Sequence, residues 1–278
     1  MGRNPHLASV LDFLAQSASI ETGFEGIGTF ELSQDKCDGL ARIFQAVLKP
    51  DYPAAVEELK SFEHDERPQV RNFFSAHVLK ERKKEWTGHG INRTFRFWSE
   101  AEKQDYLRFT VQVLDALASK YDACLGYGSV LSIVRDGDLV PHDDDLDIIV
   151  SMRRDSIASY KAGLAEVEKF LTDSGFSVRG DYVAHRHVTN GRFFLDVFFG
   201  LEDGRHVSWH PGPREVMLKE SVFPAKTETL FGIDCLVPKD SEAYLATVYG
   251  ENWRTPLPGW THDFDPTKYA DWFWPKPG

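Results

Sequence analysis

Residues 125–150 read LGYGSVLSIVRDGDLVPHDDDLDIIV and place four aspartates within five positions, directly before an apolar run. That run, residues 148–150, is β-branched and predicts a buried strand. Because side chains alternate along a strand, we expect Asp145 and Asp147 on one face at its start and Asp144 on the other. Two adjacent carboxylates need a compensating charge, which a divalent cation supplies most simply. The stretch therefore predicts a Mg²⁺ site for phosphate chemistry, with Mn²⁺ as a substitute.

A glycine-serine pair precedes the acidic run. Gly128 would let the backbone approach a phosphate, and Ser129 is placed to cap a short helix over residues 130–135. Arg135 ends that helix with a guanidinium fork that suits phosphate oxygens. Asp143 is a further candidate for the metal or for a water in its shell. The spacing of these residues indicates one phosphate-binding centre.

A second aspartate-bearing strand is predicted farther along the chain. Residues 182–188 and 192–199 flank an Asn-Gly pair, which strongly favours a hairpin. Asp196 interrupts the apolar run Phe-Phe-Leu-Asp-Val-Phe-Phe, and a lone carboxylate there is costly unless it is paired or metal-bound. It is either a metal ligand or a buried aspartate that accepts from local donors. His185 and His187 would share a strand face, as a metal pair or as a polar face, and no third ligand stands out at a suitable spacing.

Composition narrows the class of protein. The chain has 278 residues, enough for one large or two small domains, and a formal net charge of −11. This charge argues against a nucleic-acid partner, which requires a basic face. The cysteines are few, odd in number and far apart, so we expect a reducing, cytoplasmic setting; they are Cys37, Cys124 and Cys235. No apolar run approaches the length of about eighteen residues that a membrane span needs, and no secretory leader is apparent.

The apolar spacing predicts two regions, a helical region over residues 1–98 and a catalytic domain over residues 99–278. In the first, helical periodicity marks segments near residues 7–14, 40–48 and 54–62, and a fourth that starts at Pro68. In the second, Ser99 and Glu102 form a capping box for a helix to about Lys120. We expect a further helix over residues 151–174, a last strand over 231–237 and a helix to about Tyr249. The aromatic tail from Trp260 to Trp274 indicates no mechanism.

These motifs resemble the LicD/fukutin family, a branch of the nucleotidyltransferase superfamily. Its signature runs Gly-Ser-Leu-Leu-Gly-x-x-Arg, then Pro-Trp-Asp-Asp-Asp-x-Asp. The resemblance covers roughly residues 100 to 256 and is densest at 126–148, with Ser132 in place of the family's Gly and His142 in place of its Trp. It implies an α/β (α+β) fold, a nucleotidyltransferase-like mixed β-sheet flanked by helices, here with the N-terminal helical region added. It also implies that Asp196 supplies the third carboxylate beside Asp145 and Asp147.

The resemblance further implies a Mg²⁺-dependent transferase. Such an enzyme moves a phosphorylated alcohol from a CDP-activated donor, such as CDP-choline or CDP-ribitol, to a hydroxyl of a glycan or glycoconjugate. Asp145, Asp147 and Asp196 would hold the metal, and Asp196 could take the acceptor's proton; Gly128, Ser129 and Arg135 would contact phosphate oxygens. Two other functions stay open: transfer of a nucleotide from an NTP to a small molecule or protein, and a non-catalytic nucleotide-binding module.

Overall fold

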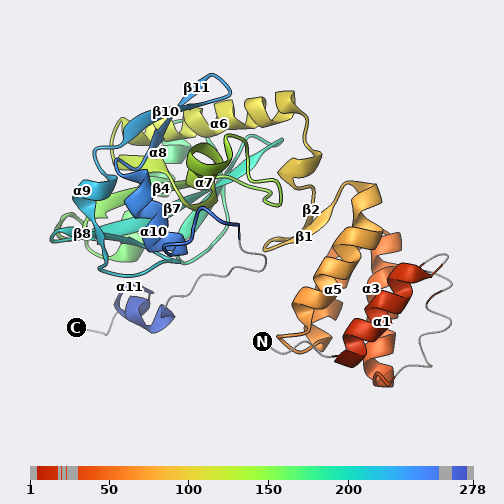
Figure 1. Ribbon diagram of the computed structural model, residues 1–278. Helices are drawn as coiled ribbons and strands as arrows, with labels where there is room; N and C mark the ends of the chain where they lie inside the picture. The colour runs from red at the N-terminus through yellow and green to blue at the C-terminus, as the bar shows by residue number, and fades with distance from the viewer. Residues whose placement is uncertain (1–4, 18–19, 21–22, 24–30, 257–264, 274–278) are drawn as a thin grey trace. The chain divides into compact units, whose positions relative to one another are not determined.

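The computed structural model describes residues 5–17, 20, 23, 31–256 and 265–273. The chain divides into two compact units, Met1–Trp98 and Ser99–Gly278, which the colours of Figure 1 separate into red to orange and yellow to blue. None of the helices in the described ranges has the length and apolar character that crossing a bilayer requires.

The first unit is built mainly from helices, as the apolar spacing predicts. They are α1 (Pro5–Gln16), α3 (Gln34–Leu48), α4 (Tyr52–Glu58) and α5 (Arg67–Phe74), and α5 continues into a π-helical turn, Ser75–Leu79. Residues at helical spacing point inward and form the core of this unit; among them are Leu7, Val10, Leu14, Leu40, Ile43, Val47, Val70 and Phe74. A short antiparallel hairpin, β1 (Glu85–Thr87) and β2 (Gly90–Asn92), is an addition that helical periodicity did not predict.

The second unit is organised by a mixed sheet, which confirms the predicted fold class. Within the described residues it has seven strands, in the order β3-β4-β7-β6-β5, with β8 paired to β7 and β9 paired to β8. β4 and β7 run parallel and the other neighbours run antiparallel. The strands are β3 (Asp122–Leu125), β4 (Asp147–Arg153), β5 (Ser177–Arg179), β6 (His185–Thr189), β7 (Phe194–Asp203), β8 (His206–Trp209) and β9 (Met217–Leu218). β10 (Lys226–Leu230) and β11 (Ile233–Val237) form a separate hairpin.

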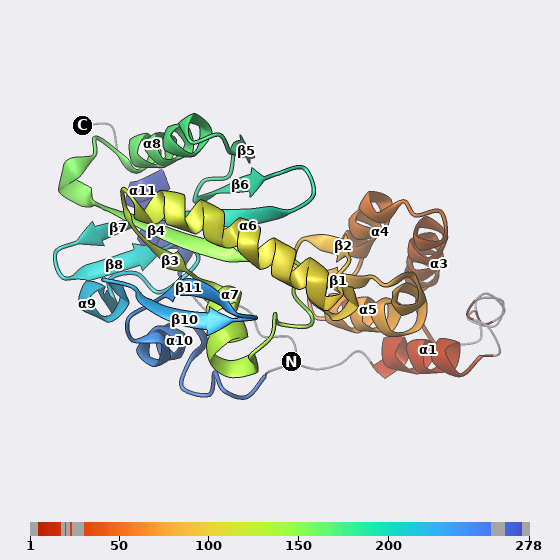
Figure 2. The same ribbon diagram turned by 90° about the horizontal axis from the view of Figure 1, so that it is seen from above.

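The helices of this unit are α6 (Glu100–Ala118), α7 (Tyr127–Leu131), α8 (Tyr160–Asp173), α9 (Lys219–Val222), α10 (Ser241–Tyr249) and α11 (Ala270–Phe273). Figure 2 shows α8 and α10 on opposite sides of the sheet. On one face, Gly163 of α8 lies so close to Phe199 that an added Cβ would be 2.4 Å from its ring. On the other, Tyr127 of α7 meets the edge of Phe198 at 5.0 Å between ring centroids. Alternation along β7 therefore gives Asp196 the same face as Phe198, the side of α7.

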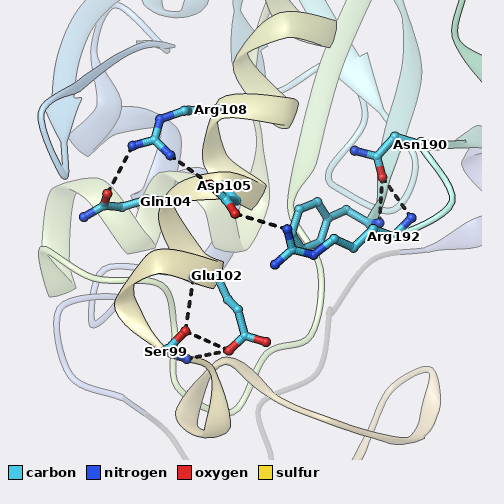
Figure 3. Close-up of polar contacts among 8 residues, drawn as sticks. Ser99, Glu102, Gln104, Asp105, Arg108, Asn190 and Arg192 are labelled. Atoms are coloured by element: carbon cyan, nitrogen blue, oxygen red, sulfur yellow. Dashed lines mark hydrogen bonds and ion pairs between the residues drawn. The ribbon is translucent and has the colours of Figure 1, made fainter.

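The predicted capping box opens α6, as Figure 3 shows. The Ser99 hydroxyl accepts from the Glu102 N–H at 3.3 Å, and the Glu102 carboxylate accepts from the Ser99 N–H at 2.8 Å. Farther along the helix, Asp105 pairs with Arg192 at 3.1 Å, and the Asn190 amide oxygen accepts from the Arg192 N–H at 3.0 Å. These contacts fasten the predicted β6–β7 hairpin to α6.

The helix expected over residues 151–174 begins later than predicted. β4 continues to Arg153, and α8 starts after Ser159, whose side chain accepts from the Ala162 N–H. Ser151 stays in the strand because its buried hydroxyl donates to Glu202 at 2.8 Å. The sequence predicts that this polar residue starts a helix, whereas a charged partner on the neighbouring strand β7 keeps it extended.

The described part of the aromatic tail covers α8; Trp260 and Trp274 lie outside the described residues. Trp272 stacks on Tyr160 at 4.9 Å between ring centroids. Asp271 accepts from Arg214 at 3.0 Å, and this guanidinium lowers the pKa of the Asp271 carboxyl. The tail therefore helps to bury the first residue of α8.

Tyr106 of α6 ties the starts of β4 and β7 together. Its fully buried hydroxyl accepts from the Leu146 N–H at 2.7 Å and donates to the Phe194 carbonyl at 2.5 Å. Burial, followed by the negative charge of Asp145, raises the pKa of the phenol well above its ordinary value, so that it stays protonated and can donate. Leu146 directly precedes β4 and Phe194 begins β7, so one hydroxyl sets the relative position of the two strands.

Replacing Tyr106 with phenylalanine should destabilise the second unit. The Tyr106→Phe change leaves the buried Leu146 N–H and the part-buried Phe194 C=O without this partner. An unpaired buried group costs about 1–3 kcal/mol, so most of the loss should come from the Leu146 N–H. Urea denaturation would measure the free energy of unfolding, and hydrogen exchange of peptides that contain Leu146 would locate the change. Tyr121→Phe is the matched control, since its hydroxyl contacts Glu166 at the surface and its loss should cost no more than about 0.5 kcal/mol. Equal losses in the two variants would contradict this role of Tyr106.

Candidate functional site

The first residues of β4 and β7 bring three of the predicted ligands next to one another. The parallel pairing puts Asp147 in register with Asp196, and the Asp196 N–H donates to the Leu146 carbonyl at 3.0 Å. A carboxylate oxygen of Asp145 lies within 4.8 Å of one on Asp196. Asp145 and Asp196 are almost fully buried, and Asp147 is partly buried. The three predicted ligands therefore lie together at one end of the sheet.

Asp143 and Asp144 belong to the same acidic group, which corrects the expectation that Asp144 points away. Carboxylate oxygens of Asp143, Asp144 and Asp145 lie within 4.8 Å of one another, and Asp144 is buried. The chain turns here, since the Asp143 N–H donates to the Val140 carbonyl and its carboxylate accepts from the Asp144 N–H, both at 3.0 Å. The strand begins only at Asp147, so two-residue alternation does not apply to the preceding aspartates.

Mutual repulsion shapes the electrostatics of this group. Burial, and then the charges of Asp145 and Asp196, raise the pKa of Asp147 well above its ordinary value; Asp143 and Asp144 add to the rise. A bound cation would offset both the cost of burying the charged Asp147 carboxylate and its repulsion by the neighbouring carboxylates. The ligand atoms are carboxylate oxygens a few ångströms apart, which is the chemistry that hard divalent cations such as Mg²⁺ require. The acidic group therefore fits a divalent metal.

The glycine-serine pair supports the acidic run by contacts that differ from those predicted. Ser129 does not cap α7, because it lies inside the helix and Gly126 is the N-cap residue. Its buried hydroxyl instead accepts from the Asp147 N–H at 2.7 Å, at the first residue of β4. Gly128 gives room to the acidic run, since an added Cβ would lie 2.7 Å from a carboxylate oxygen of Asp143. Tyr127, between the two glycines, has φ +42°, an uncommon conformation for a residue with a side chain.

Arg135 lies in a π-helical turn, Ser132–Asp136, that continues α7. Its guanidinium makes two contacts with Asp136, at 2.6 and 2.9 Å, and donates to the Trp253 carbonyl at 3.3 Å. The Asp136 carboxylate raises the pKa of Arg135, which stays charged. Arg135 therefore contacts the segment that follows α10, and its guanidinium is paired with the carboxylate of Asp136.

Tyr244 and Tyr249 of α10 border the site, and the sequence did not single them out as functional residues. The Tyr244 hydroxyl accepts from the Tyr127 N–H at 3.0 Å. Burial, followed by the neighbouring Tyr244 and Asp147, raises the pKa of Tyr249 well above its ordinary value, while Arg135 lowers it. A phenol that stays protonated can donate to an anion. Trp253, which follows α10, is buried.

Replacing Gly128 with alanine should weaken divalent cation binding without destabilising the protein. An added Cβ displaces the Asp143 carboxylate, whereas alanine is favoured over glycine in a helix by about 1 kcal/mol. We expect the metal-free melting temperature of Gly128→Ala to stay equal or rise, and its increase on adding Mg²⁺ to shrink. Gly88→Ala is the control, because a Cβ there meets nothing within 4 Å. An undiminished Mg²⁺-dependent increase in Gly128→Ala would show that Asp143 lies outside the binding site.

A match to a protein-family model agrees with the resemblance noted in the sequence. Residues 120–240 match the family model described as LicD/FKTN/FKRP, nucleotidyltransferase domain. A crystal structure of ANT(2″)-Ia in complex with adenylyl-2″-tobramycin is 15% identical, with a TM-score of 0.37 over 60% of this chain and 84% of that chain. A solution structure of the antibiotic-resistance factor ANT(2″)-Ia is also 15% identical, with a TM-score of 0.37 over 57% of this chain and 78% of that chain. No curated protein sequence matches this chain significantly. The matched range contains the glycine-serine pair, the acidic run and Asp196, and the chain therefore carries a nucleotidyltransferase domain of the LicD/FKTN/FKRP family.

Proposed function

We propose that this protein is a Mg²⁺-dependent transferase that moves a phosphorylated alcohol from a CDP-activated donor to a hydroxyl of a glycan or glycoconjugate. The family supports a transferase of phosphate-type groups, and the acidic group supports a divalent metal. The observation that carries the proposal is the parallel register of Asp147 with Asp196, with Asp145 within 4.8 Å of Asp196. Asp145, Asp147 and Asp196 are the proposed metal ligands.

In the proposed reaction, the acceptor oxygen forms a bond to the phosphorus that carries the alcohol. The bond from that phosphorus to the bridging oxygen of the donor breaks, and CMP leaves with the electron pair. The acceptor's proton passes to a carboxylate oxygen of the acidic group that is not engaged as a ligand. Bound Mg²⁺ would supply charge neutralisation on the donor's phosphates.

The remaining candidate residues have separate tasks in this proposal. Ser129 holds the first residue of β4 through its contact with the Asp147 N–H, and so positions a ligand. Gly128 leaves space for Asp143 to join the metal shell. Arg135 and Tyr249 supply donors toward phosphate oxygens, the arginine after release from Asp136.

Asparagine at Asp145 or Asp147 should abolish metal-dependent stabilisation and catalysis. In wild-type protein, Mg²⁺ with CDP-choline should raise the melting temperature, since a ligand that binds the folded state stabilises it. In Asp145→Asn and Asp147→Asn this rise should disappear, and turnover should fall at least about 100-fold, or about 2.7 kcal/mol of transition-state stabilisation. The metal-free variants should be no less stable than wild type, because each loses one of several repelling charges. Asp173→Asn, an exposed acid on α8, is the control.

Labelled donors separate this reaction from its alternatives. The protein would be incubated with CDP-choline labelled in the choline, and in parallel with CTP and ATP labelled in the nucleotide, each with Mg²⁺ and glycan acceptors. Label from choline on the product, with CMP released, supports the proposal. Nucleotide label on the product would establish nucleotidyl transfer. Nucleotide binding without turnover of any donor, equal in wild type and Asp145→Asn, would favour a non-catalytic module.

A further inference from the structure

We infer that the sheet holds a second metal site, made of His185 and His187 of β6 and Asp196 of β7, that selects an imidazole-binding ion such as Zn²⁺ or Co²⁺. The site lies beside the acidic group and shares one residue with it. The chain's own residues define it, so it does not depend on which donor the enzyme uses.

The strand register creates this ligand set. His185 and His187 are two residues apart on β6 and therefore share a face. The antiparallel pairing of β6 with β7 puts His187 opposite Asp196 and His185 opposite Phe198. The two histidines thus approach Asp196 from one side of β7, while Asp147 of β4 is its register partner on the other side.

The ligand atoms converge. His187 Nδ1 contacts Asp196 Oδ1, and His185 Nε2 lies 3.5 Å from Asp196 Oδ2. One ligand atom from each residue lies within 4.8 Å of the other two. The side chains of His185 and His187 are 20% and 25% exposed and that of Asp196 is 4% exposed, so the imidazoles can be reached from solvent while the carboxylate is fixed. Each imidazole approaches a different oxygen of the same carboxylate.

Aromatic rings hold the two imidazoles in place. Tyr182 stacks on His185 at 4.4 Å and 13°, and meets His187 edge-on at 4.7 Å. Phe198 packs on His185 at 4.8 Å. Gly180, with φ +84°, lets the backbone pass against the Tyr182 ring, because an added Cβ would be 2.6 Å from it. Such support fixes ring orientation before any ion binds, which is what a preformed metal site needs.

The donor atoms select the kind of ion. Mg²⁺ and Ca²⁺ prefer oxygen ligands, whereas imidazole suits Zn²⁺, Co²⁺ and other transition ions. Two imidazoles and one carboxylate also leave coordination positions open, as in catalytic zinc sites. Tyr182 and Phe194 are exposed next to the histidines, so a ligand of the ion can approach from that side. The acidic group and the histidine group would therefore bind different ions and share Asp196.

A Co²⁺ titration of the full, tag-free chain tests this inference. The protein is stripped with a chelator, saturated with Mg²⁺, and titrated with Co²⁺ alone while visible d–d absorption is recorded; Zn²⁺ competition gives its affinity. We expect one Co²⁺ per chain with nitrogen-ligand bands. His185→Gln and His187→Gln should each weaken Co²⁺ binding by more than about 100-fold, beyond the roughly 10–100-fold that loss of an outer-shell partner costs. His206→Gln, a histidine of β8 in the same sheet, should change nothing.

The outcomes distinguish a metal site from a positioning role. The inference would be overturned if Co²⁺ still binds both histidine variants, or if its affinity falls by no more than roughly 10–100-fold. The histidines would then be hydrogen-bond partners that orient Asp196. Loss of Co²⁺ in Asp145→Asn but not in the histidine variants would do the same. Should a variant fail to fold, wild-type protein labelled with ¹⁵N-histidine gives the answer, because Zn²⁺ must shift the ring nitrogens of two histidines. The Mg²⁺ response of Asp147→Asn tests the proposed function separately.

Discussion

The parallel pairing of β4 with β7 is the constraint on which the site depends. It places Asp147 beside Asp196 and forces like charges together in a partly buried space. The same strands bury Ile148, Val150 and Phe199 completely, and each such side chain stabilises the fold by about 1.5–3 kcal/mol. Alternation puts these three apolar side chains on the face opposite Asp147 and Asp196, and their burial offsets the repulsion between the carboxylates.

Local patterns predicted much of this arrangement. The apolar residues after Asp147 form a buried strand, the capping box at Ser99 opens α6, and the Asn-Gly pair closes a hairpin. Each of these depends on residues close in sequence, whose spacing already encodes the geometry. The expectation for Asp144 was wrong because it extended strand alternation into a turn. The expectation for Ser129 was wrong because its hydroxyl, which could have capped a helix, instead accepts from the Asp147 N–H of β4.

Contacts between distant segments could not be predicted in the same way. The parallel partner of β4 lies beyond α8, β5 and β6, so nothing near Asp147 in the sequence indicates Asp196 as its neighbour. For the same reason the two histidines of β6 lacked a visible third ligand, although the register supplies one nine residues later. The sequence did not single out Tyr106, and only its two backbone partners reveal that it sets the relative position of the two strands.

The pair formed by Arg135 and Asp136 has a consequence for ligand discrimination. The guanidinium already holds a carboxylate of its own chain, in a two-point geometry that a phosphate would also use. In the proposed reaction, an incoming anion would have to displace that carboxylate, which would then return to water. A monoanion would replace one contact with a similar one, so its binding free energy would be small. A diphosphate carries more charge and more oxygens, so it would bind more favourably than the carboxylate that it displaces. The neighbouring aspartate thus acts as an internal competitor that would filter small anions from the site before any chemistry begins.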